Sequence, residues 1–140
     1  GGPMEISRPG GGMTTTGERC APHLPGLEGP DLQRAYYYFI FPNMLVSLQP
    51  DFVLVHRLVR NGPGRSLIAC EWLYHPDAIA EPDFDPGPAV QFWDETNSQD
   101  WTICERSQAG VSSRAYTPGP YSSLETMLAV IDRQYLQAMS

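Results

Sequence analysis

One carboxylate in this sequence lies among apolar residues of a predicted helix. Residues 89 to about 107 contain neither proline nor glycine, so they are predicted to form a helix, and Gly110 marks its expected end. At the helical period, Asp100 shares one side of that helix with Trp93 and Cys104. A carboxylate in such surroundings loses hydration, which is unfavourable unless a basic side chain, hydrogen bonds or a metal ion compensates.

Periodicity alone leaves three interpretations of Asp100 open. It is an exposed acid on a more hydrated helix, a structural acid held by hydrogen bonds, or a metal-binding or catalytic acid. The only basic residue of the helix, Arg106, projects from a different side, so a local ion pair is poorly supported.

Composition and charge argue against several classes of partner. The chain of 140 residues suffices for one compact domain. A net charge of −7 argues against nucleic acid and against an anionic membrane surface. No run approaches the ~18 apolar residues of a membrane-spanning helix, and no signal-peptide pattern opens the chain. The chain begins with "GGP" rather than Met, so we expect a fragment or a processed or tagged product.

The cysteines and histidines do not form a metal-binding pattern. Cys20, Cys70 and Cys104 lie far apart, and an odd count without a CxxC motif favours free thiols in a reducing cytoplasm. The "CAPH" segment has CxxH spacing but no CxH partner, and we interpret it as chance. His56 and His75 are interpreted as ordinary strand residues.

The chain divides by composition near residue 33. Residues 1–33 hold eight of the thirteen glycines and five of the fourteen prolines, so they are predicted to be a loop or a disordered lead-in. From residue 34 onward, the pattern predicts ordered elements that form the rest of the domain, residues 34–140.

Four strand-like runs follow the lead-in, at residues 34–41, 44–49, 51–59 and 65–75. "RNGPG" joins the last two runs and is a strong hairpin signal. Alternate residues of the third run form two faces, and neither face is cleanly polar. We therefore expect a sheet that is covered on one side and lines something on the other.

Two helices are predicted after the strands. The connection at residues 75–88 contains one short helical turn at most, and the helix with Asp100 follows it. "SSLETMLAVIDRQYLQAM" then carries a capping box, Ser122-x-x-Glu125, before an apolar stripe. Strands followed by helices predict an α+β fold with an antiparallel sheet.

Several motifs in the second half of the chain together resemble a known family. Around Asp100 they are QDW, CE, SQ-x-G and Y-x-PGP-x-S-x-x-E, and "FPN" precedes a strand further upstream. From about residue 36 to residue 125, the sequence resembles the C-terminal part of the catalytic domain of Rieske non-haem iron oxygenase α-subunits, the aromatic-ring-hydroxylating family. That resemblance implies a helix-grip (START-like) fold, a curved antiparallel sheet wrapped around a long helix.

The resemblance also implies a mononuclear Fe(II) held by two histidines and one carboxylate. The carboxylate of the family motif falls on Asp100, which would be the metal ligand and catalytic residue and would face an interior pocket. Asn97 and Glu105, near Asp100 along the helix, are candidates for groups that support the ligand.

Parts of the family pattern are missing from this sequence. The family's two histidines are separated by four residues, and no two of His23, His56 and His75 have that spacing. The Rieske [2Fe–2S] domain is absent as well. We expect the C-terminal portion of a larger enzyme, inactive alone, whose partners are the rest of the α-subunit, a neighbouring subunit's Rieske domain in a homotrimer, and a reductase or ferredoxin.

The resemblance implies a mono- or dioxygenase that uses O₂ on a small organic substrate. The QDW-x-x-CE variant favours quaternary amines, oxidised by hydroxylation or N-demethylation, over aromatic compounds. Two alternatives remain: a non-catalytic helix-grip module that binds a ligand without metal, and a degenerate fragment without function.

Overall fold

The computed structural model describes residues 3–7 and 10–140. By internal contacts the chain divides into two compact units, Gly1–Thr102 and Ile103–Ser140, each of which is described by itself. The boundary falls inside the longest helix.

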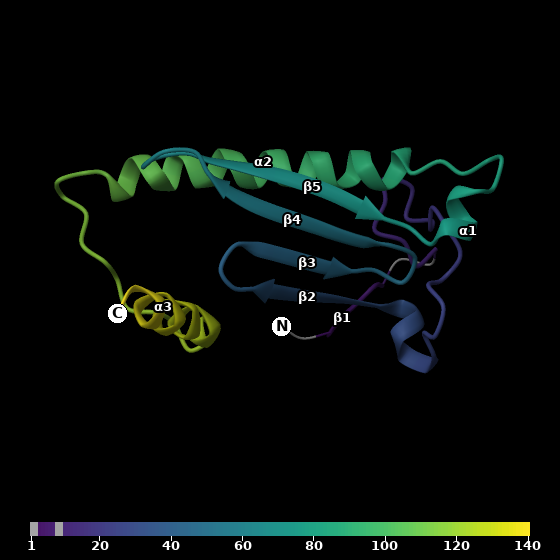
Figure 1. Ribbon diagram of the computed structural model, residues 1–140, viewed down its shortest axis with the longest axis horizontal. Coiled ribbons are helices and arrows are strands. Elements are labelled where there is room, and N and C mark those ends of the chain that lie inside the picture. Colours follow the sequence, from purple (N-terminus) through teal and green to yellow (C-terminus); the bar gives the residue numbers. More distant parts are fainter. Residues whose placement is uncertain (1–2, 8–9) are drawn as a thin grey trace. The chain divides into compact units, whose positions relative to one another are not determined.

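The first unit contains a five-stranded antiparallel sheet, ordered as in the sequence (Figure 1). Its strands are β1 (Pro3–Glu5), β2 (Arg34–Ile40), β3 (Met44–Leu48), β4 (Val53–Arg60) and β5 (Ser66–Leu73). The α+β class and the four strand-like runs are confirmed, because alternating aromatic and β-branched residues bounded by turn residues fit a pleated sheet.

The β4–β5 hairpin forms where the sequence predicts it. Asn61 N donates to Arg65 O at 2.9 Å, which closes the five-residue loop. Gly62 has a φ of 89°, a backbone region that glycine adopts at little cost. The pairing of all eight residues of β4 with β5 follows from this turn.

The described residues of the lead-in include two short elements. They are β1, which pairs with the first three residues of β2, and a 3-10 helix, η1 (Gly29–Gln33). Thr14 is fully buried and donates to the carbonyl of Glu18 at 2.7 Å, which holds a tight loop. The prediction that this segment lacks strands was wrong for β1.

One face of the sheet is covered by the long helix α2 (Gly87–Val111), which follows the short helix α1 (Pro76–Ile79). Within this unit, α2 lies along β4 and β5 (Figure 1) and contacts both strands through Asn97. The core between them is made of Phe52, Leu54, Ala89 and Trp93. Tyr37, Trp72, Tyr74 and Phe92 pack around this core.

The other face of the sheet carries mostly apolar residues that are partly or largely exposed. Leu67 and Leu73 of β5 are among them, as are Val59 of β4 and Tyr38 of β2. The ion pair between Arg57 and Glu71 crosses the two strands on this face. The prediction of one covered and one lining face is thus confirmed for the covered face.

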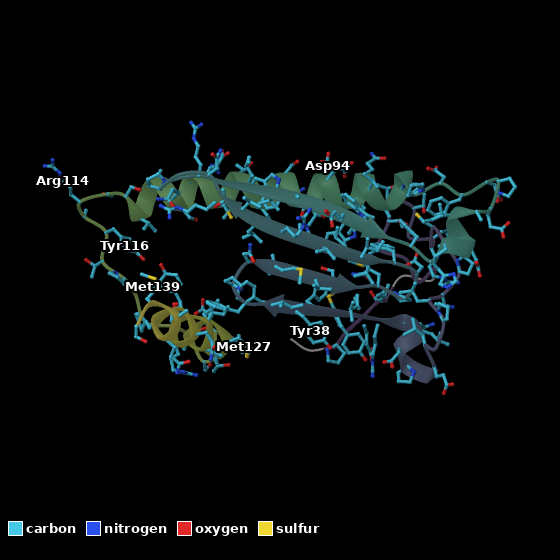
Figure 2. The ribbon with its side chains drawn as sticks, viewed as in Figure 1. Tyr38, Asp94, Arg114, Tyr116, Met127 and Met139 are labelled. Atoms are coloured by element: carbon cyan, nitrogen blue, oxygen red, sulfur yellow. The ribbon has the colours of Figure 1, made fainter. Side chains whose placement is uncertain are left out.

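The second unit contains the end of α2 and the helix α3 (Thr126–Met139). α3 begins four residues after Ser122, so the predicted capping box does not mark the helix start. Ser122 N nevertheless donates to Glu125 Oε2 at 2.7 Å, which is one of the two bonds of a capping box, and this bond lowers the pKa of Glu125. Met127 and Met139, labelled on α3 in Figure 2, are both largely exposed.

The described residues bear on the predictions about the cysteines and about membrane spans. All three cysteines are free thiols, as expected from their spacing. Among helices of the described residues, none is long and apolar enough to cross a membrane.

Candidate functional site

A row of side chains crosses the sheet on the face beneath α2. The strand register pairs Phe39 with Leu45, Leu45 with His56, and His56 with Cys70. Directly opposed residues point to the same face, so these four side chains line up across β2 to β5. The two ends of the row differ, because Phe39 and Leu45 are exposed whereas His56 is only 6% exposed.

Asn97 of α2 lies over the buried end of this row. Its Oδ1 is 3.2 Å from His56 Nε2, and its Nδ2 donates to Cys70 Sγ at 3.7 Å. Asn97 is 7% exposed, so its amide is satisfied by the sheet rather than by water. Burial raises the pKa of the Cys70 thiol, and the charge of Asp94 adds to this effect.

At this contact, the spacing of residues along α2 matches the spacing of residues along β4. Trp93 packs with Leu54 in the core, and Asn97 meets His56, two residues further along β4. Four helical residues rise about 6 Å and two strand residues about 7 Å, so one helical turn matches one row of the sheet. Trp93 also meets the His56 ring edge-on, with ring centroids 6.4 Å apart.

Asp100 lies on the sheet-facing side of α2 but is exposed. The buried residues of the helix are Ala89, Trp93 and Asn97. At 100° per residue, Asp100 is within about 60° of Asn97 and about 20° of Trp93 around the axis. Asn97 is the last buried residue of α2, and Asp100 is solvent-exposed.

The prediction that Asp100 is buried in an interior pocket was therefore wrong for this chain. Of its expected neighbours, Trp93 is buried but Cys104 is exposed, and Ile103 is 62% exposed. Burial needs a covering element, and the buried residues of α2 end at Asn97.

The Asp100 carboxylate has no hydrogen-bond or ion-pair partner among residues 3–7 and 10–140. No group of three or more His, Cys, Asp or Glu side chains in the described part of the chain could hold a metal ion. The donor set present is thus one free carboxylate, which fits one position of a two-histidine, one-carboxylate site and is insufficient alone.

The other predicted supporting residue, Glu105, is exposed and lies five residues beyond Asp100. By the helical period these two residues differ by about 140° around the axis, so they do not share a side. Its supporting role stays a prediction that no described contact tests.

The histidines lie in three different environments. His23 Nε2 is 3.2 Å from the carbonyl of Leu32, and His75 accepts a hydrogen bond from Asp77 N at the start of α1. His56 was interpreted as an ordinary strand residue, and its contact with Asn97 was missed. The available signal was its place two residues after Leu54 on the same strand face.

A second buried polar group lies in the turn between β3 and β4. Asp51 is fully buried, and its Oδ2 accepts from Cys20 N at 3.0 Å, which ties the lead-in to the sheet. Burial raises the pKa of Asp51, although this hydrogen bond opposes the change. Burial also raises the pKa values of the Cys20 thiol and the Tyr74 hydroxyl, so both stay protonated at neutral pH.

The fold and the buried contact between α2 and the sheet define an α+β domain in which one long helix packs against one face of an antiparallel sheet. A family model described as the ring hydroxylating alpha subunit (catalytic domain) matches residues 1–140. The chain belongs to this family.

Similar proteins carry more specific names. The chain is 36% identical over 111 residues to the glycine betaine monooxygenase oxygenase subunit of Chromohalobacter salexigens, covering 79% of this chain and 25% of that protein. The subunit of the same name from Pseudomonas aeruginosa is 32% identical, with 79% and 26% covered. The chloroplastic choline monooxygenase of Atriplex hortensis is 25% identical over 63% of this chain and 20% of its own length. The chain thus spans about a quarter of the length of the first two relatives and a fifth of the third.

Proposed function

We propose that this chain supplies the C-terminal part of the catalytic domain of a Rieske-type non-haem iron oxygenase. The full-length protein would use O₂ to oxidise a small quaternary amine. The observation that carries the proposal is the family match over residues 1–140, together with relatives named as glycine betaine and choline monooxygenases.

Asp100 is proposed as the single carboxylate ligand of the iron. Two features support this role: its position on the sheet-facing side of α2 and a carboxylate that no described residue engages. Asn97, buried one turn earlier, is proposed to hold this part of the helix in place. Glu105 is kept as a weaker candidate for support, on sequence proximity only.

The iron would supply O₂ activation, while one anionic and two imidazole ligands leave positions open for O₂ and substrate. The two histidines are proposed to come from chain outside these 140 residues. This chain would contribute the carboxylate and the sheet row with Phe39 and Leu45, whose exposed side chains offer an apolar surface next to the buried His56.

The helix-grip arrangement and the partners belong to the same proposal. α2 packed on β4 and β5 supports a grip in which additional sheet or loop would enclose the exposed part of the helix. The division at residue 33 into a lead-in and a domain is also proposed. The partners would be the rest of the α-subunit, the Rieske [2Fe–2S] domain of a neighbouring subunit in a trimer, and a reductase or ferredoxin.

The proposed substrate class is a quaternary N-methyl amine. Insertion of one oxygen atom into an N-methyl C–H bond gives an N-hydroxymethyl group, which releases formaldehyde and leaves a tertiary amine. The second oxygen atom of O₂ leaves as water, with two electrons from the reductase and two protons. Formaldehyde therefore distinguishes N-demethylation from hydroxylation elsewhere.

A second candidate is a non-catalytic ligand-binding domain without metal. The lack of any metal-binding group of three side chains among the described residues favours this candidate for the chain by itself. One experiment separates the two candidates: glycine betaine, choline and an aromatic acid are offered to the full-length protein with its reductase, and O₂ uptake and formaldehyde are measured. The oxygenase proposal expects substrate-dependent O₂ uptake, and no uptake with any substrate by iron-replete protein would overturn it.

A further inference from the structure

We propose that His56 is a positioning residue for the catalytic site. Its Nε2–H holds the Asn97 side chain against the sheet and thereby fixes the rotation of α2 at the turn that carries Asp100. This inference rests on the proposed ligand role of Asp100.

The contacts of Asn97 assign the hydrogen positions on His56. The Asn97 amide nitrogen points to Cys70 Sγ, so Oδ1 faces the imidazole and accepts from Nε2. The imidazole therefore carries its hydrogen on Nε2. This tautomer agrees with the surroundings of Nδ1, which is buried and has no hydrogen-bond partner within the described residues. Nδ1 therefore acts as an acceptor without a hydrogen.

Asn97 is the last buried residue along α2, so its contact with the sheet restrains the helix close to Asp100. Its side chain is held by two strands at once, through His56 of β4 and Cys70 of β5. The Cys70 bond is long and involves a thiol, which is a weak partner, so His56 supplies most of the restraint. Between Asn97 and the unit boundary at Thr102, only Trp101 is half-buried.

Displacement of a metal ligand lowers the rate of catalysis. A misplacement of about 1 Å in a reacting group lowers rates by about 100-fold, and loss of groups that orient metal ligands lowers affinity or activity by about 10- to 100-fold. Loss of the His56–Asn97 bond is therefore expected to lower turnover per bound iron, rather than only the stability of the fold.

The test compares three substitutions at His56 in the full-length protein with its reductase. His56→Leu removes the bond. His56→Asn keeps a polar side chain whose amide is too short to reach Asn97. His56→Gln places an amide nitrogen near the original Nε2 and restores a donor. Turnover and the fraction of O₂ recovered in product are measured and normalised to bound iron.

His56→Leu and His56→Asn are expected to lose about tenfold in turnover per iron, with O₂ diverted from product. His56→Gln is expected to recover most of the loss, and His75→Gln serves as a control at a half-exposed histidine that caps α1. Equal values for His56→Leu and the parent, or equal losses for His56→Gln and His56→Leu, would overturn the proposal.

A second measurement does not depend on activity or on the folding of variants. A long-range ¹H–¹⁵N correlation spectrum of the unaltered chain should show the His56 hydrogen on Nε2, and a hydrogen on Nδ1 would overturn the proposal. Failure of the proposed function gives a different result, because the parent protein would then show no turnover at all, and failure of the ligand role alone would leave iron and turnover in Asp100→Ala whatever the His56 variants do.

Discussion

Asn97 and Asp100 lie one helical turn apart on the sheet-facing side of α2, yet Asn97 is buried and Asp100 is exposed. The sheet covers the helix up to Asn97 through hydrogen bonds to two strands. Past Asn97, no residue of α2 is buried. A buried, hydrogen-bonded amide at Asn97 and an exposed carboxylate at Asp100, unpaired within the described residues, therefore lie within a single turn of the helix.

The Asn97 amide is expected to contribute measurably to stability. Asn97→Ala leaves His56 Nε2 buried without its partner, which typically costs about 1–3 kcal/mol in the free energy of unfolding. Urea denaturation of this chain measures the loss, and Gln99→Ala, at an exposed site two residues on, should change stability by less than about 0.5 kcal/mol. Equal effects at both positions would contradict the contact.

The core beneath α2 is expected to be sensitive to truncation. Leu54 is fully buried between Phe52 and Trp93, so Leu54→Ala should lower the free energy of unfolding by about 2–5 kcal/mol. Leu73→Ala, at a residue that is 52% exposed on the opposite face, is the matched control and should have little effect. A small loss at Leu54 would mean that α2 does not pack on the sheet as described.

Asp51 is expected to make stability depend on pH in the acid range. Because burial raises its folded-state pKa above the unfolded value of 3.8, folding favours the protonated form. The stability that it contributes is complete below pH 3.8 and is lost as pH rises through the folded-state pKa. For each pH unit by which the folded-state pKa exceeds the unfolded value, the loss is about 1.4 kcal/mol.

Asp51→Asn isolates this effect, since an amide oxygen still accepts from Cys20 N but carries no charge. The free energies of unfolding of both proteins are measured by urea denaturation from about pH 3 upward, which begins below the unfolded pKa. The difference, native minus variant, should fall with rising pH across this window and then become constant. A difference that rises with pH would contradict the burial of the ionised carboxylate.

Iron binding is expected to require chain beyond these 140 residues. One carboxylate is a weak site, and the described residues supply no second and third ligand beside it. Elemental analysis of this chain after incubation with Fe(II) should find well below one iron per chain, with no difference between the native sequence and Asp100→Ala. Stoichiometric iron that is lost on this substitution would show that the chain holds a complete site.

The elements that depend on local sequence were predictable. The β4–β5 hairpin follows from "RNGPG" and the alternating runs beside it, and α2 follows from a long stretch without glycine or proline. β1 was missed because three residues become a strand only through pairing with β2, about thirty residues away. α3 begins at Thr126, later than the capping box predicts, although Ser122 and Glu125 form a bond of that box.

The candidate site was only partly predictable, for a related reason. Helical periodicity predicts which side of α2 carries Asp100, but whether a side chain is covered depends on elements that are distant in sequence. The His56–Asn97 contact joins residues 41 positions apart and required the strand register and the placement of α2. His56 carries no spacing motif, so its residue type alone could not distinguish a helix partner from an ordinary strand residue.

The proposed role of Asp100 also predicts a selective loss of activity in the full-length protein. Asp100→Ala should abolish turnover and lower bound iron, because the anionic ligand is removed. Asp94→Ala is the control, since Asp94, labelled in Figure 2, is also an exposed acid on α2 but lies about 120° around the helix from Asp100. Turnover that survives in Asp100→Ala would exclude the assignment.

The most direct measurement is anomalous diffraction at the iron absorption edge from crystals of the iron-loaded, full-length protein. We expect one mononuclear peak with a carboxylate oxygen of Asp100 in its coordination shell and two imidazoles from outside this chain. A mononuclear iron coordinated by other groups, with Asp100 still facing solvent, would contradict the account.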